Sequence, residues 1–270
     1  MLRSVLFVPG VRTDRFAKAL AAGADAVVFD LEDSVDAARK ADARREVGAF
    51  LSGIAAGGPL VCVRVNACGS RWIADDLAAV TAMRAAQAIV LPKAQSAADV
   101  EEIARVVSPR PVLPLIETAR GVLEAGAIAA ARATIPALLF GAEDLTAELG
   151  VPRTVDGDAL VVPRSLVALA AAAAGADAID AVFTDVANRD RLREDALRAR
   201  ALGFRGKMAI HPDQIAVIHE VFTPTAVEID RARRIVEAYD AARARGEGVV
   251  RLGDEMIDAP VVARARRVLG

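Results

Sequence analysis

The chain has 270 residues and a mass of 28.2 kDa, a size at which α/β barrels often form a single domain. Hydrophobic residues make up 54% of it, enough for a large buried core, which excludes a disordered chain. The 34 basic residues are balanced by 36 acidic ones and aromatic residues make up only 4%, so a nucleic-acid-binding protein and a protein held on an anionic membrane are excluded.

The N-terminal residues do not resemble a secretory signal, because Pro9 and Gly10 end their short apolar stretch and no small-residue cleavage site follows. The two cysteines, Cys62 and Cys68, form no Cys-x-x-Cys pair and join no histidine cluster, so structural zinc is not expected. No apolar run reaches the roughly 18 residues of a membrane-spanning helix. We expect a soluble cytoplasmic protein.

Short apolar runs alternate with amphipathic helical segments along the chain. The runs are rich in Val, Ile, Leu and Phe and are bounded by Gly, Pro or Asp, a pattern typical of buried parallel strands. In chain order they are Ser4–Val8, Ala26–Asp30, Val61–Asn66, Ala88–Leu91, Val112–Ile116, Ala137–Phe140, Ala178–Phe183 and Lys207–Ile210. Eight such units predict an α/β fold, a (β/α)8 TIM barrel. The rival, a doubly wound open sheet, is disfavoured because no Gly-x-Gly-x-x-Gly follows the first strand.

Residues 1–215 are predicted to form the barrel, and residues 216–270 a C-terminal helical extension. The extension contains a helical pattern over Ala226–Ala244, a short apolar run over Val249–Leu252 and a final helix over Val261–Leu269. Because it carries too little apolar surface for a separate domain, we expect it to pack on the barrel or on a neighbouring subunit.

Polar side chains lie at or near the carboxyl end of each predicted strand, where the active site of such a barrel lies. They are Arg12, Asp30, Glu32, Asp33, Arg64, Asn66, Lys93, Glu117, Glu143, Asp144, Asp185 and His211. A ring of carboxylates almost without histidine favours a hard divalent cation, above all Mg²⁺. The alternative is that these acids cap helices, which we favour for Asp33 and Asp185 but not for Glu117, which ends an apolar strand.

Two cations in this ring have open roles. Arg64 lies between valines in mid-strand and needs an anion, either a ligand carboxylate or a buried acid of the ring. Lys93 either pairs with the acids, which we favour, or acts as a Schiff-base nucleophile. Of the histidines, His211 is a candidate ligand contact and His219 is predicted to be a solvated helix residue.

Several strings of the chain resemble the citrate lyase β-subunit/malyl-CoA lyase family of HpcH/HpaI aldolases. The strings, in order, are Arg3–Gly10 (RSVLFVPG), Asp30–Val35 (DLEDSV), Arg64–Asn66 (RVN), Leu91–Lys93 (LPK), Ile116–Thr118 (IET), Phe140–Leu145 (FGAEDL), Ile210–Pro212 (IHP) and Met256–Pro260 (MIDAP). They span nearly the whole chain. The resemblance implies a Mg²⁺-dependent carbon–carbon lyase on a (β/α)8 barrel that forms homotrimers or hexamers.

The same resemblance implies roles for individual residues. Glu117 and Asp144 would hold the metal, and Arg64 would clamp the carboxylate of the keto-acid portion. Asp258 would reach a neighbour's site as the catalytic acid/base, although simple subunit packing is its alternative. Substrate or the coenzyme A tail would contact the positions of Phe7, Arg12 and Lys18.

The resemblance leaves the substrate open among malyl-CoA, citramalyl-CoA and citryl-CoA. A stand-alone lyase would cleave such a β-hydroxyacyl thioester to a keto acid and an acyl thioester, or condense them. The alternative is a citrate lyase β subunit acting on a citryl group held by an acyl-carrier protein. Outside this class, a metal-independent Schiff-base aldolase using Lys93 and a non-catalytic thioester-binding subunit stay open.

Overall fold

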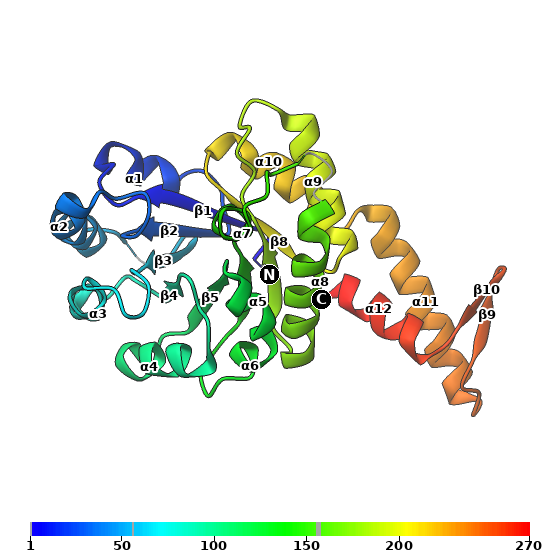
Figure 1. Cartoon of the computed structure of the whole chain (residues 1–270). Helices are drawn as coiled ribbons and strands as arrows, with labels where there is room; N and C mark the ends of the chain where they lie inside the picture. The colour runs from blue at the N-terminus through cyan, green and yellow to red at the C-terminus, as the bar shows by residue number, and fades with distance from the viewer. Residues whose placement is uncertain (1, 56, 155–157) are drawn as a thin grey trace. The chain divides into compact units, whose positions relative to one another are not determined.

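Eight parallel strands close into a barrel in the computed structural model, which describes residues 2–55, 57–154 and 158–270 (Figure 1). The strands are β1 (Ser4–Pro9), β2 (Ala26–Asp30), β3 (Leu60–Arg64), β4 (Ala88–Leu91), β5 (Val112–Ile116), β6 (Ala137–Phe140), β7 (Asp177–Asp180) and β8 (Gly206–Ala209). Strand β1 pairs with both β2 and β8, which closes the barrel. The predicted (β/α)8 fold is confirmed.

The predicted strand boundaries differ most at β7. We expected that strand to continue to Phe183, but it ends at Asp180, and residues 181–188 form the loop before the next helix. The apolar run misleads here because Val182 and Phe183 pack as loop residues rather than as strand.

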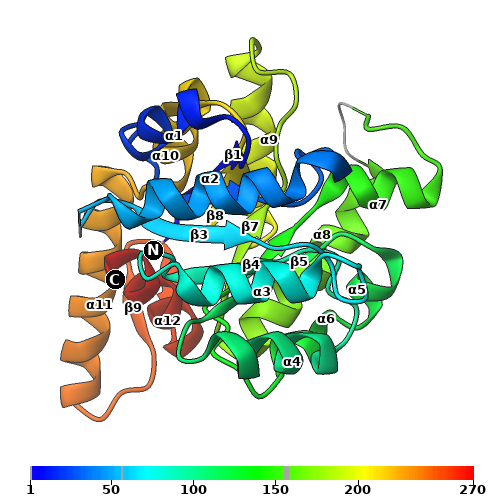
Figure 2. The same ribbon diagram turned by 90° about the vertical axis from the view of Figure 1, so that its left-hand side faces the viewer.

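The helices around the barrel follow the strands in chain order. They are α1 (Thr13–Leu20), α2 (Lys40–Ser52), α3 (Ile73–Ala82), α4 (Ala97–Val107), α5 (Ala119–Leu123), α6 (Ala125–Ala129), α7 (Ala142–Leu149), α8 (Asp158–Ala174), α9 (Arg189–Ala201) and α10 (Ile215–Phe222), with short 3₁₀ turns at Ala37–Arg39 and Pro212–Gln214. Figure 2 shows α2 and α3 beside β3. Ser96, Thr118 and Asn188 begin α4, α5 and α9 by accepting a hydrogen bond from a backbone N–H of the first turn.

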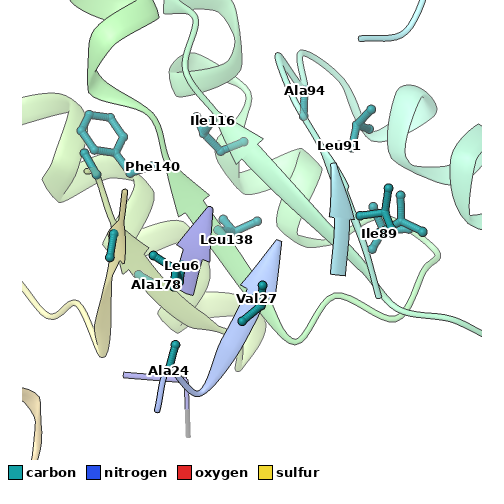
Figure 3. Close-up of a cluster of buried hydrophobic side chains, with 14 of the residues drawn as sticks. Leu6, Ala24, Val27, Ile89, Leu91, Ala94, Ile116, Leu138, Phe140 and Ala178 are labelled. Atoms are coloured by element: carbon teal, nitrogen blue, oxygen red, sulfur yellow. The ribbon is translucent and has the colours of Figure 1, made fainter. Parts of the chain in front are cut away.

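The buried apolar side chains form two layers, as alternation along each strand requires. One set fills the barrel interior and includes Val5, Val28, Leu113 and Met208. The other faces the helices, and Figure 3 shows several of its members, drawn from different strands: Leu6, Val27, Ile89, Ile116 and Leu138. Each strand is therefore buried on both faces, which explains its continuous apolar sequence.

Four charged side chains form a buried network on the outer side of the barrel. Nη2 of Arg164 on α8 and Nζ of Lys207 on β8 each contact both Asp180 and Asp195, at 2.6–3.0 Å. Lys207 and Asp180 are fully buried, and Arg164 nearly so. The two cations and two carboxylates compensate one another, so the network ties α8, β7, α9 and β8 together.

His219 on α10 lies at the amino end of the barrel rather than in solvent, so the predicted solvated histidine is wrong. Its Nε2 is 2.7 Å from Oγ of the fully buried Ser4 and 3.7 Å from Asp25. Helical periodicity alone did not reveal that this face of α10 packs on β1.

The chain divides into two compact units, through Phe222 and from Thr223 to Gly270. The second unit contains α11 (Ala226–Ala244), a hairpin of β9 (Val250–Leu252) and β10 (Glu255–Ile257), and α12 (Ala259–Leu269). Its own small core includes Ile235, Tyr239 and Ile257. Over the described residues of both units, no helix is long and apolar enough to cross a membrane.

Candidate active site

Strand alternation determines which side chains face the carboxyl mouth of the barrel. Each strand places every second residue inside, so the residue two positions after the last interior one points into the mouth. The interior residues Val5, Val28, Cys62, Leu115 and Leu139 are followed in this way by Phe7, Asp30, Arg64, Glu117 and Gly141. The strands thus bring together residues that lie far apart in the sequence.

A cavity of about 330 Å³ occupies this mouth. One part of its lining is apolar and another is densely charged. The lining residues are Phe7, Pro9, Arg15, Asp30, Asp33, Ser34, Arg64, Leu115, Glu117, Gly141, Ala142, Glu143, Asp144, Val182, Met208 and Ile210. A concave, partly apolar site with a few convergent charges is the usual form of a small-molecule site.

Arg64 is held by the acids of the β2 turn. Its Nε and Nη2 each donate to one oxygen of Asp30 at 2.6 Å, and its Nη1 is 2.9 Å from Oε2 of Glu32. Its guanidinium also lies over the ring of Phe7, 5.3 Å from the centroid. Burial lowers the pKa of Arg64, but the charges of Asp30 and Glu32 outweigh it and raise that pKa. Arg64 therefore pairs with buried acids, one of the two roles that the sequence left open. Its guanidinium also lines the cavity, and it has five N–H donors, so at least two remain for a ligand.

Lys93 links the acids on opposite sides of the mouth. Its Nζ contacts Glu32, is 3.0 Å from Oδ2 of Asp33 and is 3.7 Å from Oδ2 of Asp144. Burial alone would lower the pKa of Lys93. The hydrogen bonds and charges of the neighbouring carboxylates outweigh that effect and raise the pKa, so the side chain is an ammonium ion. Because a Schiff-base nucleophile must be a neutral amine, the predicted pairing with the acids is the role that the geometry supports.

Glu117 is a buried residue whose carboxylate accepts a hydrogen bond from a backbone N–H. The backbone N–H of Lys93, a residue at φ +50°, donates to its Oε1 at 2.9 Å. Burial raises the pKa of Glu117 to about 8; the charge of Arg64 opposes this effect and that of Asp144 adds to it. The carboxylate occupies space that Gly141 leaves open, since a Cβ at position 141 would lie 2.5 Å from its Oε2.

Asp144 and Glu143 lie in the first turn of α7 and have different partners. Glu143 pairs with Arg153 at 2.9 Å. The side chain of Asp144 is 38% exposed, and among the described residues its cationic partner is Lys93, at 3.7 Å. Asp144 is therefore the acid of this turn that is free to bind a ligand in the cavity beside Glu117.

The donors at the mouth fit magnesium. Glu117 and Asp144 offer carboxylate oxygens, which Mg²⁺ prefers, and the described residues that line the cavity include neither histidine nor cysteine. Within the described residues, no three His, Cys, Asp or Glu side chains converge on one point. Two carboxylates are enough for Mg²⁺, because this ion commonly takes one or two carboxylates from the protein and completes its shell with water and substrate.

Other predicted residues of the first unit are not part of the cavity lining. Arg12 is half exposed and pairs with Asp14, and Lys18 is exposed on α1. Asp185 is exposed in the β7–α9 loop, where Asn188 rather than Asp185 caps α9. His211 begins a 3₁₀ turn by accepting a hydrogen bond from the N–H of Asp213.

Asn66 and Asp258, the remaining two predicted residues, are held by hydrogen bonds of their own. Asn66 is buried behind the mouth, and Asp258 caps α12 in the second unit through the N–H of Val261.

Sequence reasoning missed two cations near the mouth. Arg15 lines the cavity from α1, and Lys40 is buried behind the Asp30–Asp33 turn. Arg15 is one of two basic residues on an ordinary amphipathic helix, α1. Lys40 follows another basic residue, Arg39, at the start of α2, so neither carries a distinguishing pattern.

Comparison with known proteins identifies the family. The sequence pattern of the HpcH/HpaI aldolase/citrate lyase family matches residues 3–212, which include every strand of the barrel. The chain belongs to the HpcH/HpaI aldolase/citrate lyase family. The resemblance seen in the sequence strings is thereby confirmed.

Relatives of this HpcH/HpaI chain carry different activities in their names. A citrate lyase subunit beta-like protein of Deinococcus radiodurans is 40% identical over 277 residues, covering 100% of this chain and 96% of that protein. A (3S)-malyl-CoA thioesterase of Cereibacter sphaeroides is 35% identical over 267 residues, covering 99% and 93%. The solved structure of CitE from Mycobacterium tuberculosis with magnesium, acetoacetate and coenzyme A matches with a TM-score of 0.82 at 39% identity, covering 99% and 96%.

Proposed function

We propose that the chain is a Mg²⁺-dependent carbon–carbon lyase. It cleaves a β-hydroxyacyl thioester of the malyl-CoA, citramalyl-CoA or citryl-CoA type to a keto acid and an acyl thioester, and catalyses the reverse condensation. The observation that carries this proposal is a single cavity lined by Glu117, Asp144 and Arg64. The CitE structure with magnesium, acetoacetate and coenzyme A supports it, because that relative combines a metal, a keto acid and a thioester carrier.

In the proposed reaction Glu117 and Asp144 would hold the metal. When bound, Mg²⁺ supplies positive charge that polarises the oxygen of the keto-acid portion. Arg64 binds the neighbouring carboxylate with donors that Asp30 and Glu32 leave unused, and these two acids keep the guanidinium in place. Arg64 is therefore already oriented before substrate arrives, which lowers the cost of binding.

Cleavage breaks the bond between the hydroxyl-bearing carbon and the carbon next to the thioester. The carboxylate of Asp258 is the proposed base that takes the proton of the hydroxyl, whose oxygen becomes the carbonyl of the keto acid, while the bonding electron pair leaves with the thioester as an enolate. Asp258 is the proposed acid that protonates the enolate carbon, and in the reverse direction it removes that proton. The apolar wall of Leu115, Met208 and Ile210 excludes water from this charge as it develops.

The thioester carrier would lie along the first βα unit. Phe7 lines the cavity and Arg15 stands at its edge, while Arg12 and Lys18 extend along α1. Cations beside the cavity suit the phosphates of coenzyme A, which are multiply charged. Arg12, Lys18 and Phe7 thus stay the proposed contacts of the carrier, joined by Arg15.

We further propose a homotrimer or hexamer in which Asp258 serves the site of a neighbouring subunit. Asp258 is half-buried and holds the N-terminus of α12, so its carboxylate has a fixed direction. Sedimentation velocity of the purified chain tests the oligomeric state. Mixing Asp258→Asn subunits with Arg64→Ala subunits tests the shared site, because activity returns only if one site draws on two chains.

Two related activities compete with the stand-alone lyase. The relative named (3S)-malyl-CoA thioesterase favours hydrolysis, which would release malate rather than a keto acid. The relative named citrate lyase subunit beta-like protein favours a subunit that acts on a carrier-protein thioester. Product analysis separates all three. Malyl-CoA that gives glyoxylate and acetyl-CoA identifies a lyase, and malate with free coenzyme A identifies a thioesterase. Turnover of a citryl-carrier protein but of no coenzyme A ester identifies the subunit.

A further inference from the structure

Lys40, the first residue of α2, is a buried lysine that has no part in the proposed reaction. Only 5% of it is exposed, whereas lysine side chains normally reach solvent. Its Nζ donates to three oxygens: the backbone carbonyls of Leu31 and Glu32, both at 2.8 Å, and Oδ1 of Asn66 at 2.7 Å. The three protons of the ammonium group are thus fully used.

The two carbonyls belong to the turn that carries the charged side of the cavity. In that turn, the carboxylate of Asp30 accepts from the N–H of Glu32 at 2.9 Å and from the N–H and hydroxyl of Ser34. The turn is therefore held by Asp30 on one side and by Lys40 on the other. The side chains it presents, Asp30 and Glu32, are the ones that hold Arg64 and Lys93.

Asn66, the third hydrogen-bond partner of Lys40, is itself held in place by hydrogen bonds. Asn66 donates from Nδ2 to Oδ2 of Asp76 at 2.6 Å and to the carbonyl of Leu31 at 3.0 Å. Asp76 is itself fully buried and accepts from Arg44 at 2.8 Å. Lys40 therefore joins the turn to a rigid buried network between α2 and α3 and does not merely fill space.

We infer that Lys40 is a positioning residue for the carboxylate-binding side of the cavity. By fixing the carbonyls of Leu31 and Glu32 it sets the direction of Asp30 and Glu32, and through them it sets Arg64 and Lys93. The inference rests on the proposed function in so far as Arg64 binds a carboxylate. Its action on the turn does not depend on that function.

The matched pair of variants is Lys40→Met and Lys207→Met. Both substitutions remove a buried ammonium group that is held by oxygen atoms. Lys207 differs from Lys40 in its place, because its partners Asp180 and Asp195 lie on the outer side of the barrel and do not line the cavity. Each variant is expected to lose stability, because buried acceptors or carboxylates lose their partner. A role limited to stability therefore predicts the same site behaviour in both.

The first readout needs no ligand. Amide hydrogen exchange of residues 30–35 should accelerate by about tenfold or more in Lys40→Met and stay unchanged in Lys207→Met, because only the first variant frees the turn. The second readout is the dissociation constant for oxalate, a small dicarboxylate, measured by calorimetry with and without Mg²⁺. It should rise by about 10–100-fold in Lys40→Met, as is usual when a residue supporting a site is lost, and should not change in Lys207→Met.

Two results would overturn the inference: protection of residues 30–35 that is the same in both variants, or a loosened turn with unchanged oxalate affinity. Wild-type protein that binds neither Mg²⁺ nor oxalate would contradict the proposed function, and the exchange comparison alone would then decide the role of Lys40. If Lys40→Met does not fold, Lys40→Gln keeps a shorter polar side chain that can donate to at most two of the three oxygens. It should produce the same changes at smaller size, and unchanged exchange in that variant would also overturn the inference.

Discussion

Gly141 and Glu117 share one space at the mouth of the barrel. A Cβ at position 141 would lie 2.5 Å from both Cβ and Oε2 of Glu117, closer than such atoms can approach. Gly141→Ala should therefore displace the carboxylate of Glu117. We expect about a 10–100-fold loss of Mg²⁺ affinity, measured by calorimetry, in a protein that still folds.

Gly126→Ala is the matched control for that substitution. Gly126 lies on α6, and a Cβ there would meet nothing within 4 Å. Alanine should stabilise this exposed helical position by about 0.5–1 kcal/mol and leave Mg²⁺ affinity unchanged. Equal Mg²⁺ affinity in Gly141→Ala and wild type would show that Glu117 does not need this space.

The two acids of the first turn of α7 should differ in function. Asp144→Asn removes a charged oxygen donor and should lower Mg²⁺ affinity by about 100-fold. Glu143→Gln should leave that affinity nearly unchanged, because Glu143 is paired with Arg153. Titration calorimetry of both variants decides the matter, and the opposite order of effects would assign the metal to Glu143.

Asp258→Asn separates catalysis from structure. Asparagine caps a helix as well as aspartate does, so α12 should keep its N-terminal hydrogen bond and the melting temperature should not change. Because the amide cannot donate or accept the reacting proton as a carboxyl does, kcat should fall by about 10²–10⁴-fold while Mg²⁺ binding persists. Full activity in this variant would leave Asp258 with a packing role only.

His219 should make stability depend on pH. Burial lowers its pKa below the ordinary 6.5, Arg3 lowers it further and Asp25 opposes them. The unfolded chain therefore takes up the proton more readily, so the free energy of unfolding falls as the pH drops through 6.5 and below. His219→Gln should show a smaller fall between pH 7.5 and 5.5 in urea unfolding, these two values being about one unit either side of an ordinary histidine pKa. An identical fall in both proteins would exclude this histidine as the cause.

Much of the barrel could be predicted because its strands are buried on both faces. Runs such as Val112–Ile116 and Ala137–Phe140 match the observed strands residue for residue, because a short, wholly apolar run is typical of a strand buried on both faces. The hairpin partner Glu255–Ile257 could not be predicted in this way. It is short, two of its three residues are exposed, and it has no alternating pattern.

The candidate site was predictable where strand ends determined it. Asp30, Arg64 and Glu117 follow interior positions, so strand parity alone turns them into the mouth. Lys40 and Arg15 were not predictable, because helix periodicity does not say which basic residue of a helix faces a turn or a cavity. The pairing of Arg64 with Asp30 was one of two open alternatives, and only the spatial register of β2 and β3, with Asp30 opposite Arg64, brings the two together.

The most direct test of the central claim is turnover of malyl-CoA, citramalyl-CoA and citryl-CoA by the purified chain, first with Mg²⁺ and then with EDTA. The account predicts release of glyoxylate, pyruvate or oxaloacetate from at least one of them with Mg²⁺, and loss of that activity in EDTA. Keto-acid release that survives EDTA would contradict the role of Glu117 and Asp144 as metal ligands.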